Sequence, residues 1–270
     1  MFKEETTLGD ICKWFEKNFS PDIMIPELPV IIRLDGNNFH SWTKDLKSPY
    51  DERLSSLMIE CAKFLIKETN GIVSYQQSDE LSVILYSNDL KSLIYQDGKK
   101  QKICSKLTSK LINFFNQEKE KYGLGYKKYA DFDCRVYQTP TLEWAVKQLL
   151  WREIDATKNS ISMAAQSMFP HSVLQGLHGN EMQEKMFTEK GVNWNNYPDF
   201  FKKGTYVKRI KTSRKFTQEE LDALPEKHQA KNNPDLVIER NIIQVIDIPK
   251  LSSIKNKVGF FFNNEEIELF

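Results

Sequence analysis

The chain contains the apolar run Val30-Ile31-Ile32-Arg33-Leu34, which leads directly into Asp35-Gly36-Asn37-Asn38-Phe39-His40. β-Branched residues are frequent in the run, which predicts a buried strand, and the Asp-Gly pair predicts a turn at its end. A second acidic turn, Ser78-Asp79-Glu80, lies between the apolar runs Ile72–Tyr75 and Leu81–Tyr86. Two of the predicted strands therefore each deliver a carboxylate at one end.

Two carboxylates held side by side by a sheet repel each other and lose hydration, so their pKa values rise unless a cation compensates them. Oxygen ligands of this kind suit Mg²⁺, which usually binds one or two carboxylates and completes its shell with waters and substrate phosphates. We therefore expect Asp35 and Asp79 to bind metal ions, with Glu80 in support, at a catalytic site that handles phosphates. Each turn taken alone is more simply interpreted as a surface turn with solvated acids. Only the occurrence of two such turns in one predicted sheet favours a functional site.

The residues after Asp35 are suited to close contact with a metal or a phosphate. Gly36 has no side chain to hinder approach, so its carbonyl could coordinate a metal while the following amides face phosphate oxygens. Asn37 and Asn38 tolerate the unusual backbone angles that such a turn requires.

Nearby basic residues are candidate phosphate ligands. Arg33 projects to the same face of its strand as Asp35, where it could clamp a phosphate or neutralise a neighbouring acid. His40, Lys44 and Lys47 follow the acidic turn and could reach a triphosphate, although each could also be a solvated side chain.

Hydrophobic periodicity and turn residues predict an α+β fold. The first strand is followed by a helix from about Asp51 to Thr69, the two strands around Asp79, a helix over about Lys99–Tyr122 and a strand over Ala130–Tyr137. This order is that of the ferredoxin-like βαββαβ arrangement, which polymerase palms and many unrelated proteins share. A short helix over about Asp10–Phe19 is expected to precede it.

The second half of the chain is less regular. A long helix is predicted after Thr139-Pro140, with Thr139 as its N-cap, followed by a helix near Asn180–Lys190 and a strand-like run over Leu236–Ile248. We expect a palm-like core with its lead-in over residues 1–139. Residues 140–270 would form a fingers-like helical region with a C-terminal β extension, and the two parts would pack as one catalytic unit.

The overall charge does not identify a partner, but its distribution is informative. The formal net charge is +1, whereas the stretch from Lys202 to Lys215 has seven basic residues and no acidic one. Such a stretch is either a solvated basic face or a contact surface for the phosphates of RNA. Arg152, Asp155 and Asn159 share one face of the long predicted helix, which could be an ion-paired packing surface or the wall of a polynucleotide channel.

Other features point to a cytoplasmic, reducing compartment. The four cysteines are widely spaced without a CxxC pair, so neither a zinc ribbon nor a disulfide framework is indicated. No apolar run approaches the length that spans a bilayer, and the acidic start Met1–Glu5 is unlike a secretory signal. We expect no membrane partner.

With these residues in view, the chain resembles the tRNA-His guanylyltransferase superfamily, the 3′–5′ polymerases. Each matching stretch is short, but together they keep the family's order and approximate spacing between Val30 and Thr205. The stretches are Ile32–His40, Gln77–Glu80, Arg135-Val136-Tyr137, Trp151–Asp155 with Asn159, Asn193–Asn196 and Lys203-Gly204-Thr205.

The resemblance implies a nucleotidyltransferase with a palm like that of ordinary polymerases. It implies two Mg²⁺ ions held by the side chains of Asp35 and Asp79 and by the carbonyl of Gly36. The nucleotide would contact Asp35–His40, which includes Phe39, and Ser78–Asp79. Members of this family activate an RNA 5′-monophosphate with ATP or GTP, after which the 3′-hydroxyl of an incoming nucleotide attacks the activated end.

The resemblance also implies partners. ATP and GTP would be substrates, tRNA would be the acceptor, and the chain would assemble as a homotetramer, a dimer of dimers. On this basis the residues expected to contact RNA are Arg152, Asn159, Lys203, Lys208, Arg209, Lys211 and Arg214.

The chain departs from the family at two places. Members that add a guanosine to tRNA-His carry His-Ile-Asn-Asn where this chain has Thr157-Lys158-Asn159-Ser160. They also carry a lysine before a loop proline, where this chain has Ser48-Pro49 with Lys47 one place earlier. The first departure, which keeps only Asn159, resembles the branch of "like" proteins, which repair 5′-truncated tRNAs by copying the opposite strand. Both departures count against a strict guanosine-adding role and leave the expected metal site unchanged. A strict tRNA-His guanylyltransferase and a catalytically silent RNA-binding palm module are the alternatives.

Overall fold

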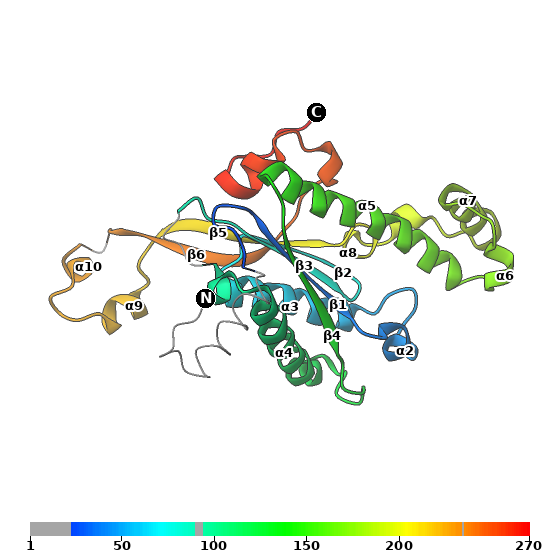
Figure 1. Cartoon of the computed structure of the whole chain (residues 1–270), viewed down its shortest axis with the longest axis horizontal. Helices are drawn as coiled ribbons and strands as arrows, with labels where there is room; N and C mark the ends of the chain where they lie inside the picture. Colours follow the sequence, from blue (N-terminus) through cyan, green and yellow to red (C-terminus); the bar gives the residue numbers. More distant parts are fainter. Residues whose placement is uncertain (1–22, 90–93, 234) are drawn as a thin grey trace, which may run out of the picture.

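The structure, a computed structural model, describes residues 23–89, 94–233 and 235–270. A six-stranded antiparallel sheet with the order β4-β1-β3-β2-β5-β6 forms its centre (Figure 1). The strands are β1 (Val30–Gly36), β2 (Val73–Gln77), β3 (Glu80–Leu85), β4 (Phe132–Gln138), β5 (Thr205–Lys215) and β6 (Val237–Ile246). The mixed α and β architecture is confirmed, and β1 to β4 follow one another as the sequence predicts. The helix expected over Asp10–Phe19 lies outside the described residues.

Two helices cover one face of the sheet, α3 (Glu52–Thr69) and α4 (Lys100–Glu118). The apolar stripe of α3 is buried, as its periodicity predicts, and it packs with α4 over the side chains of β1 and β3. Asp51 caps the start of α3 by accepting a hydrogen bond from the Arg53 amide, and Asn70 ends the helix in the left-handed conformation. Short 3₁₀ turns, η1 (Tyr95–Gly98) and η2 (Lys119–Tyr122), flank α4.

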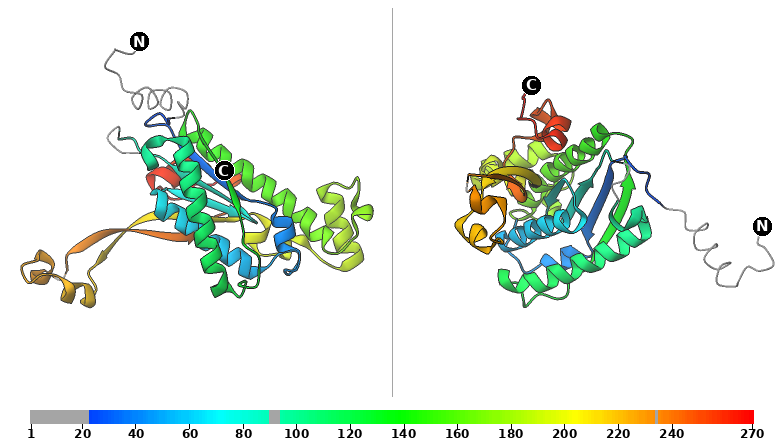
Figure 2. Two further views of the ribbon diagram at one scale, coloured as in Figure 1. Left: turned by 60° about the horizontal axis from the view of Figure 1, so that its bottom comes forward. Right: turned by 90° about the vertical axis from the view of Figure 1, so that its left-hand side faces the viewer.

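The opposite face is covered by α5 (Leu142–Gln166) and the C-terminal segment, as the right-hand view of Figure 2 shows. The prediction of Thr139 as the N-cap was wrong. The cap is Thr141, whose hydroxyl accepts a hydrogen bond from the Trp144 amide. Thr139 is held outside the helix because its amide donates to the Pro29 carbonyl and its hydroxyl to the Thr141 carbonyl. The C-terminal segment contains η4 (Leu251–Ser253) and the π-helical turn η5 (Gly259–Asn263).

The basic stretch Lys202–Lys215 contains a strand that the sequence did not predict. Its residues from Thr205 onward form β5, which pairs with β2 on one side and β6 on the other. β6 confirms the strand-like run Leu236–Ile248. Beyond the sheet, β5 and β6 continue as a two-stranded ribbon that carries α9 (Gln218–Ala223) and α10 (Gln229–Asn232) at its end (Figure 1).

Four further helical segments gather at the far end of α5. They are α6 (His171–Leu174), α7 (Gly179–Lys190), η3 (Trp194–Asn196) and α8 (Asp199–Lys202). Phe169, Met186, Trp194 and Phe201 form a separate small core there. Among the described residues, no helix is long and apolar enough to cross a membrane.

The acidic turn after β1 is supported by a cluster of aromatic rings. Phe39 begins α2 (Phe39–Thr43), and its ring centroid lies 5.2 Å from those of Trp42 and Phe132 and 5.8 Å from that of Phe115. A Cβ atom added at Gly36 would come within 2.2 Å of the Phe39 ring. The missing side chain at Gly36 is therefore required by packing, whether or not a metal binds its carbonyl.

We expect Gly36→Ala to destabilise the protein by about 1–3 kcal/mol, because the added methyl group overpacks the Phe39 cluster. Urea unfolding followed by tryptophan fluorescence measures the change. Gly179→Ala is the matched control, since the nearest atom to its added Cβ would be 3.7 Å away. Equal stability of the two variants would contradict the packing role of Gly36.

Candidate active site

The register of the sheet places three acids side by side. Asp35 in β1 lies opposite Glu80 in β3 and opposite Asp133 in β4. Directly opposed residues of antiparallel strands point to the same face, and here this is the face that α5 covers. Asp79 lies at the tip of the β2–β3 hairpin, one residue before Glu80, and Ser78 beside it has a left-handed backbone with φ of 51°.

Asp35 and Asp79 are electrostatically coupled. Burial raises the pKa of Asp79 to about 6, and the nearby charge of Asp35 adds to this shift. Burial also raises the pKa of Asp35, followed by the charge of Asp133, although three arginines oppose the shift. Because Asp79 directly precedes Glu80, which lies opposite Asp35, the acidic turn after β1 and the acidic hairpin tip lie at the same end of neighbouring strands.

The local donor set fits Mg²⁺. Within residues 23–89, 94–233 and 235–270, no three acidic, histidine or cysteine side chains gather closely enough to form a metal site by themselves. A site built on Asp35, Asp79 and the Gly36 carbonyl would thus depend on substrate oxygens for its remaining ligands, which is how Mg²⁺ is usually held. One buried carboxylate oxygen, Oδ1 of Asp133, has no hydrogen-bond partner beside this pair. All of these donors are oxygens, from carboxylates or from a neutral peptide carbonyl.

Glu80 differs from the other acids because its charge is compensated. Arg152 of α5 donates from Nε to Glu80 Oε1 at 2.6 Å and from a terminal nitrogen to Oε2 at 2.5 Å. Arg152 also contacts Asp155 at 3.1 Å, and the Asn159 amide lies 3.4 Å from the same carboxylate. Of the two interpretations of this helix face, the ion-paired one describes what Arg152 does here.

A cavity of about 350 Å³ lies next to the hairpin tip. Its wall includes three basic side chains, His40, Lys44 and Lys47, and polar groups of Gln76, Gln77 and Ser78. Larger depressions of about 670 and 630 Å³ lie against α4 and α7, but the first is lined by no charged residue and the second by several glutamates. The smaller cavity therefore suits an anionic nucleotide best.

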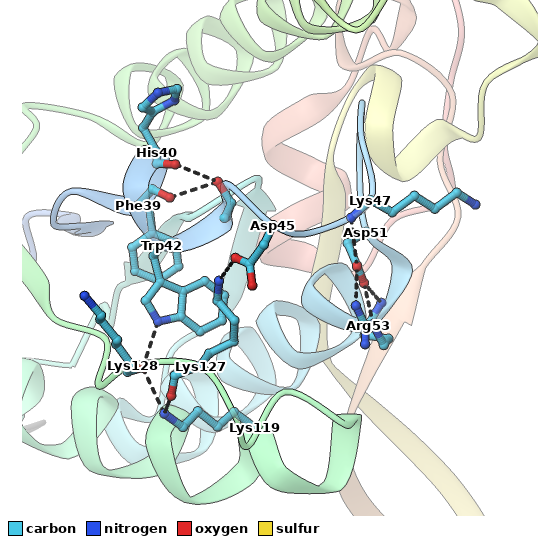
Figure 3. A network of polar contacts seen from close by, with 11 residues as sticks. Phe39, His40, Trp42, Asp45, Lys47, Asp51, Arg53, Lys119, Lys127 and Lys128 are labelled. Carbon is cyan, nitrogen blue, oxygen red and sulfur yellow. Dashed lines mark hydrogen bonds and ion pairs between the residues drawn. The ribbon is translucent and has the colours of Figure 1, made fainter.

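The loop that carries Lys44 and Lys47 is fixed at both ends (Figure 3). Asp45 forms an ion pair with Lys127. Asp51 accepts a hydrogen bond from the Lys47 amide and three from Arg53, and the Arg53 contacts lower the pKa of Asp51 to about 2. The peptide bond between Ser48 and Pro49, within this loop, is cis. The contacts of Asp45 and Asp51 thus anchor the loop that carries Lys44 and Lys47 within the fold.

The turn residues expected to bind the nucleotide play different parts. The Asn37 amide donates to the Asp131 carbonyl at 2.8 Å, so it is already used within the fold. Asn38 adopts the left-handed conformation at the start of α2, and Phe39 is buried in the aromatic cluster. His40 is exposed and faces away from Trp42 (Figure 3).

Most of the basic residues expected to contact RNA have partners inside the protein. The Lys203 ammonium donates to the Ile248 carbonyl, that of buried Lys208 to the Phe260 carbonyl, and Arg209 caps α3 through the carbonyls of Gly71 and Ile66. Lys211 and Arg214 lie on the ribbon, where they pair with Glu239 and Glu220. These two are the more exposed members of the set.

Asp133 and Arg135 are site residues that the sequence analysis did not assign a role. They alternate with Cys134 on β4, so both project to the face that carries Asp35. The alternation of Asp133, Cys134 and Arg135 was visible in the sequence, but the register that pairs β4 with β1 was not.

Asp79→Asn tests the buried charge directly. A carboxyl whose pKa is higher in the folded than in the unfolded state makes the folded protein less stable as the pH rises. Here the loss runs from the unfolded-state pKa, near 3.8, through the folded-state pKa of about 6. Without divalent ions, we expect the variant to be more stable than the wild type by about 2–3 kcal/mol at pH 8. Near pH 4 the gain should be absent.

Urea unfolding in EDTA at several pH values measures this difference. A gain that is the same at pH 4 and pH 8 would show that the charge of Asp79 costs nothing in the folded protein.

Known proteins resemble this chain in sequence and in fold. A family model described as tRNAHis guanylyltransferase matches residues 9–140. The tRNA(His) guanylyltransferase of Saccharomyces cerevisiae is 31% identical over 202 residues, covering 70% of this chain and 85% of that protein. A structure of a bacterial tRNA(His) guanylyltransferase-like protein in complex with ATP matches with a TM-score of 0.70 and 36% identity, over 75% of this chain and 88% of the other.

A second structure of such a bacterial protein, in complex with GTP, matches with a TM-score of 0.69 and 27% identity over 91% of this chain and 94% of the other. The comparisons of sequence and of fold thus agree on the family. The chain belongs to the tRNA(His) guanylyltransferase family of nucleotidyltransferases.

Proposed function

We propose that this protein is a Mg²⁺-dependent 3′–5′ nucleotidyltransferase that repairs the 5′ end of truncated tRNA. The observation that carries the proposal is the coupled pair Asp35 and Asp79, which lies beside a cavity with a basic wall. The similar bacterial proteins in complex with ATP and GTP support nucleoside triphosphates as substrates.

The proposed reaction has two transfers. First, an oxygen of the RNA 5′-monophosphate attacks the α-phosphorus of ATP or GTP, and pyrophosphate leaves. Then the 3′-hydroxyl of the incoming nucleotide attacks the activated 5′-phosphorus, losing its proton, and the nucleoside monophosphate leaves. Both steps require phosphates to be aligned and their negative charge to be neutralised.

Each part of the site has a task in this scheme. The side chains of Asp35 and Asp79 and the carbonyl of Gly36 would hold Mg²⁺, which neutralises phosphate charge and lowers the pKa of an attacking oxygen when bound. The cavity holds the activating nucleotide, with Lys44, Lys47 and His40 on its phosphates. Glu80 stays fixed by Arg152 and shapes the site from its edge.

The two parts of the chain would act together. We assign residues 1–139 to a ferredoxin-like palm with an N-terminal lead-in. Residues 140–270 form a fingers-like region with a C-terminal β extension, which the Arg152–Glu80 pair ties to the palm. A cytoplasmic homotetramer is part of the proposal through the family resemblance.

A strict tRNA-His guanylyltransferase is the second candidate. The names of the relatives favour it, since the curated ones are called tRNA(His) guanylyltransferases. The residues Thr157-Lys158-Asn159-Ser160, which keep only one position of the family's His-Ile-Asn-Asn, favour templated repair.

Asp79→Ala should reduce nucleotide addition to a 5′-monophosphorylated, truncated tRNA by at least about 100-fold, since it removes a ligand of the charged transition state. The measurement is incorporation of labelled nucleotides with Mg²⁺, with circular dichroism to verify folding. Asp222→Ala on the distant helix α9 is the control and should keep full activity. Wild-type activity in Asp79→Ala would refute the assignment of this carboxylate.

The substrate can be decided with the wild-type protein. We expect it to extend a tRNA that lacks its first nucleotide, with the base dictated by the opposite strand, at least about tenfold faster than it adds guanosine to full-length tRNA-His. A base complementary to the template is expected because pairing, and not the protein, selects it. A preference for full-length tRNA-His, without regard to the opposite base, would favour the second candidate.

A further inference from the structure

Two arginines face each other across β1 and β4 without an acid between them. Arg33 lies directly opposite Arg135, and both point to the α5 face. Like charges in directly opposed positions destabilise a sheet. In the described part of the chain, Arg33 makes no ion pair or hydrogen bond through its guanidinium, and Arg135 only approaches Asp133 at 3.8 Å. Arg33 precedes Asp35 by two positions on β1, and Arg135 lies two positions from Asp133 on β4, so both arginines lie beside these carboxylates on the same face of the sheet.

An exposed aromatic ring adjoins this pair of cations. The indole of Trp151 on α5 is 50% exposed, and the Arg33 guanidinium lies 5.5 Å from its centroid. Arg152 lies 4.7 Å from the same ring, but its nitrogens are already bound to Glu80 and Asp155. Within the described residues, the guanidinium groups here that make no hydrogen bond are therefore Arg33, which lies over the Trp151 ring, and Arg135, whose contact with Asp133 is a long ion pair.

A phosphate binds to paired arginines, and a nucleobase stacks on an exposed indole. We infer that Trp151, Arg33 and Arg135 form a binding site for the 5′-terminal nucleotide of the RNA acceptor. The phosphate lies on the two arginines and the base on Trp151. The inference rests on the proposed function, because nucleotidyl transfer needs a second nucleotide unit beside the carboxylate pair, in addition to the one in the cavity.

The openness of this surface favours the end of a polynucleotide over a free nucleoside triphosphate. Arg135 is 58% exposed and Trp151 is half exposed, so neither is enclosed as the wall of a small-molecule pocket usually is. An RNA can use such an open surface because it gains the rest of its affinity from phosphates elsewhere.

The test is fluorescence anisotropy with a 3′-labelled acceptor-stem RNA that lacks its first nucleotide and carries a 5′-monophosphate. No nucleoside triphosphate is present, so binding is measured without catalysis. We expect Trp151→Ala to weaken binding by about 5- to 50-fold, in line with the loss of one stacked base. Trp151→Phe should restore most of the affinity.

Trp144→Ala is the matched control. Trp144 lies two turns earlier on α5, is 49% exposed and has the Lys147 ammonium 4.3 Å from its ring. We expect this variant to bind like the wild type. Arg135→Gln should remove the preference for RNA with a 5′-phosphate over RNA with a 5′-hydroxyl, which a merely structural role would not affect.

Two outcomes would overturn the inference. In the first, Trp151→Ala and Trp144→Ala bind the RNA equally well. In the second, Trp151→Ala loses affinity for a non-hydrolysable ATP analogue and keeps its affinity for RNA, which would assign the surface to a free nucleotide. Binding and activity are separate readouts, so loss of RNA affinity in Trp151→Ala supports the site even if the wild type adds no nucleotide. If Trp151→Ala and Trp144→Ala bind the RNA equally well and the wild type is active, the site on Trp151 is rejected and the proposed function is not.

Discussion

The site depends on the electrostatic cost of holding Asp35 and Asp79 close together at the ends of neighbouring strands in the middle of the sheet. Strand pairing fixes the first acid and the hairpin fixes the second, so neither can move away to regain water. The arginines around Asp35 reduce this cost but leave the pKa of Asp79 near 6. A site with excess negative charge binds cations, and the bound cation can then coordinate a phosphate.

The second half of the chain completes this arrangement through two consecutive residues of α5. Arg152 binds Glu80 at the start of β3, next to Asp79. Its neighbour Glu153 is buried and accepts hydrogen bonds from the Tyr206 hydroxyl at 2.9 Å and the Leu251 amide at 2.8 Å. α5 is thereby fixed to β3, to β5 and to the C-terminal segment, which keeps Trp151 beside Arg33. The charge of Glu80 is satisfied within the protein, so the unsatisfied charge is concentrated on the other acids.

The sequence was sufficient to predict features that depend on neighbouring residues, namely helices, strands and strand ends. Periodicity located α3, α4 and the first four strands, and strand ends marked Asp35 and Asp79. Features that depend on the register of distant segments were not predictable. Asp133 and Arg135 lie beside Asp35 and Arg33 only because β4 pairs with β1 in this register. The basic stretch contains β5, where Lys208 and Arg209 bind backbone carbonyls. The pairing of Arg152 with Glu80 joins residues 72 positions apart, which no local pattern encodes.

The central claim is that Asp35 and Asp79 share divalent ions. The most direct measurement is a crystal structure of the protein with Mn²⁺, as a stand-in for Mg²⁺, and a non-hydrolysable ATP analogue, with anomalous diffraction to locate the metal. The account predicts an anomalous peak about 2.2 Å from carboxylate oxygens of both residues, in contact with the phosphates of the nucleotide. A bound nucleotide with no peak at this pair, or with manganese held by other residues alone, would contradict it.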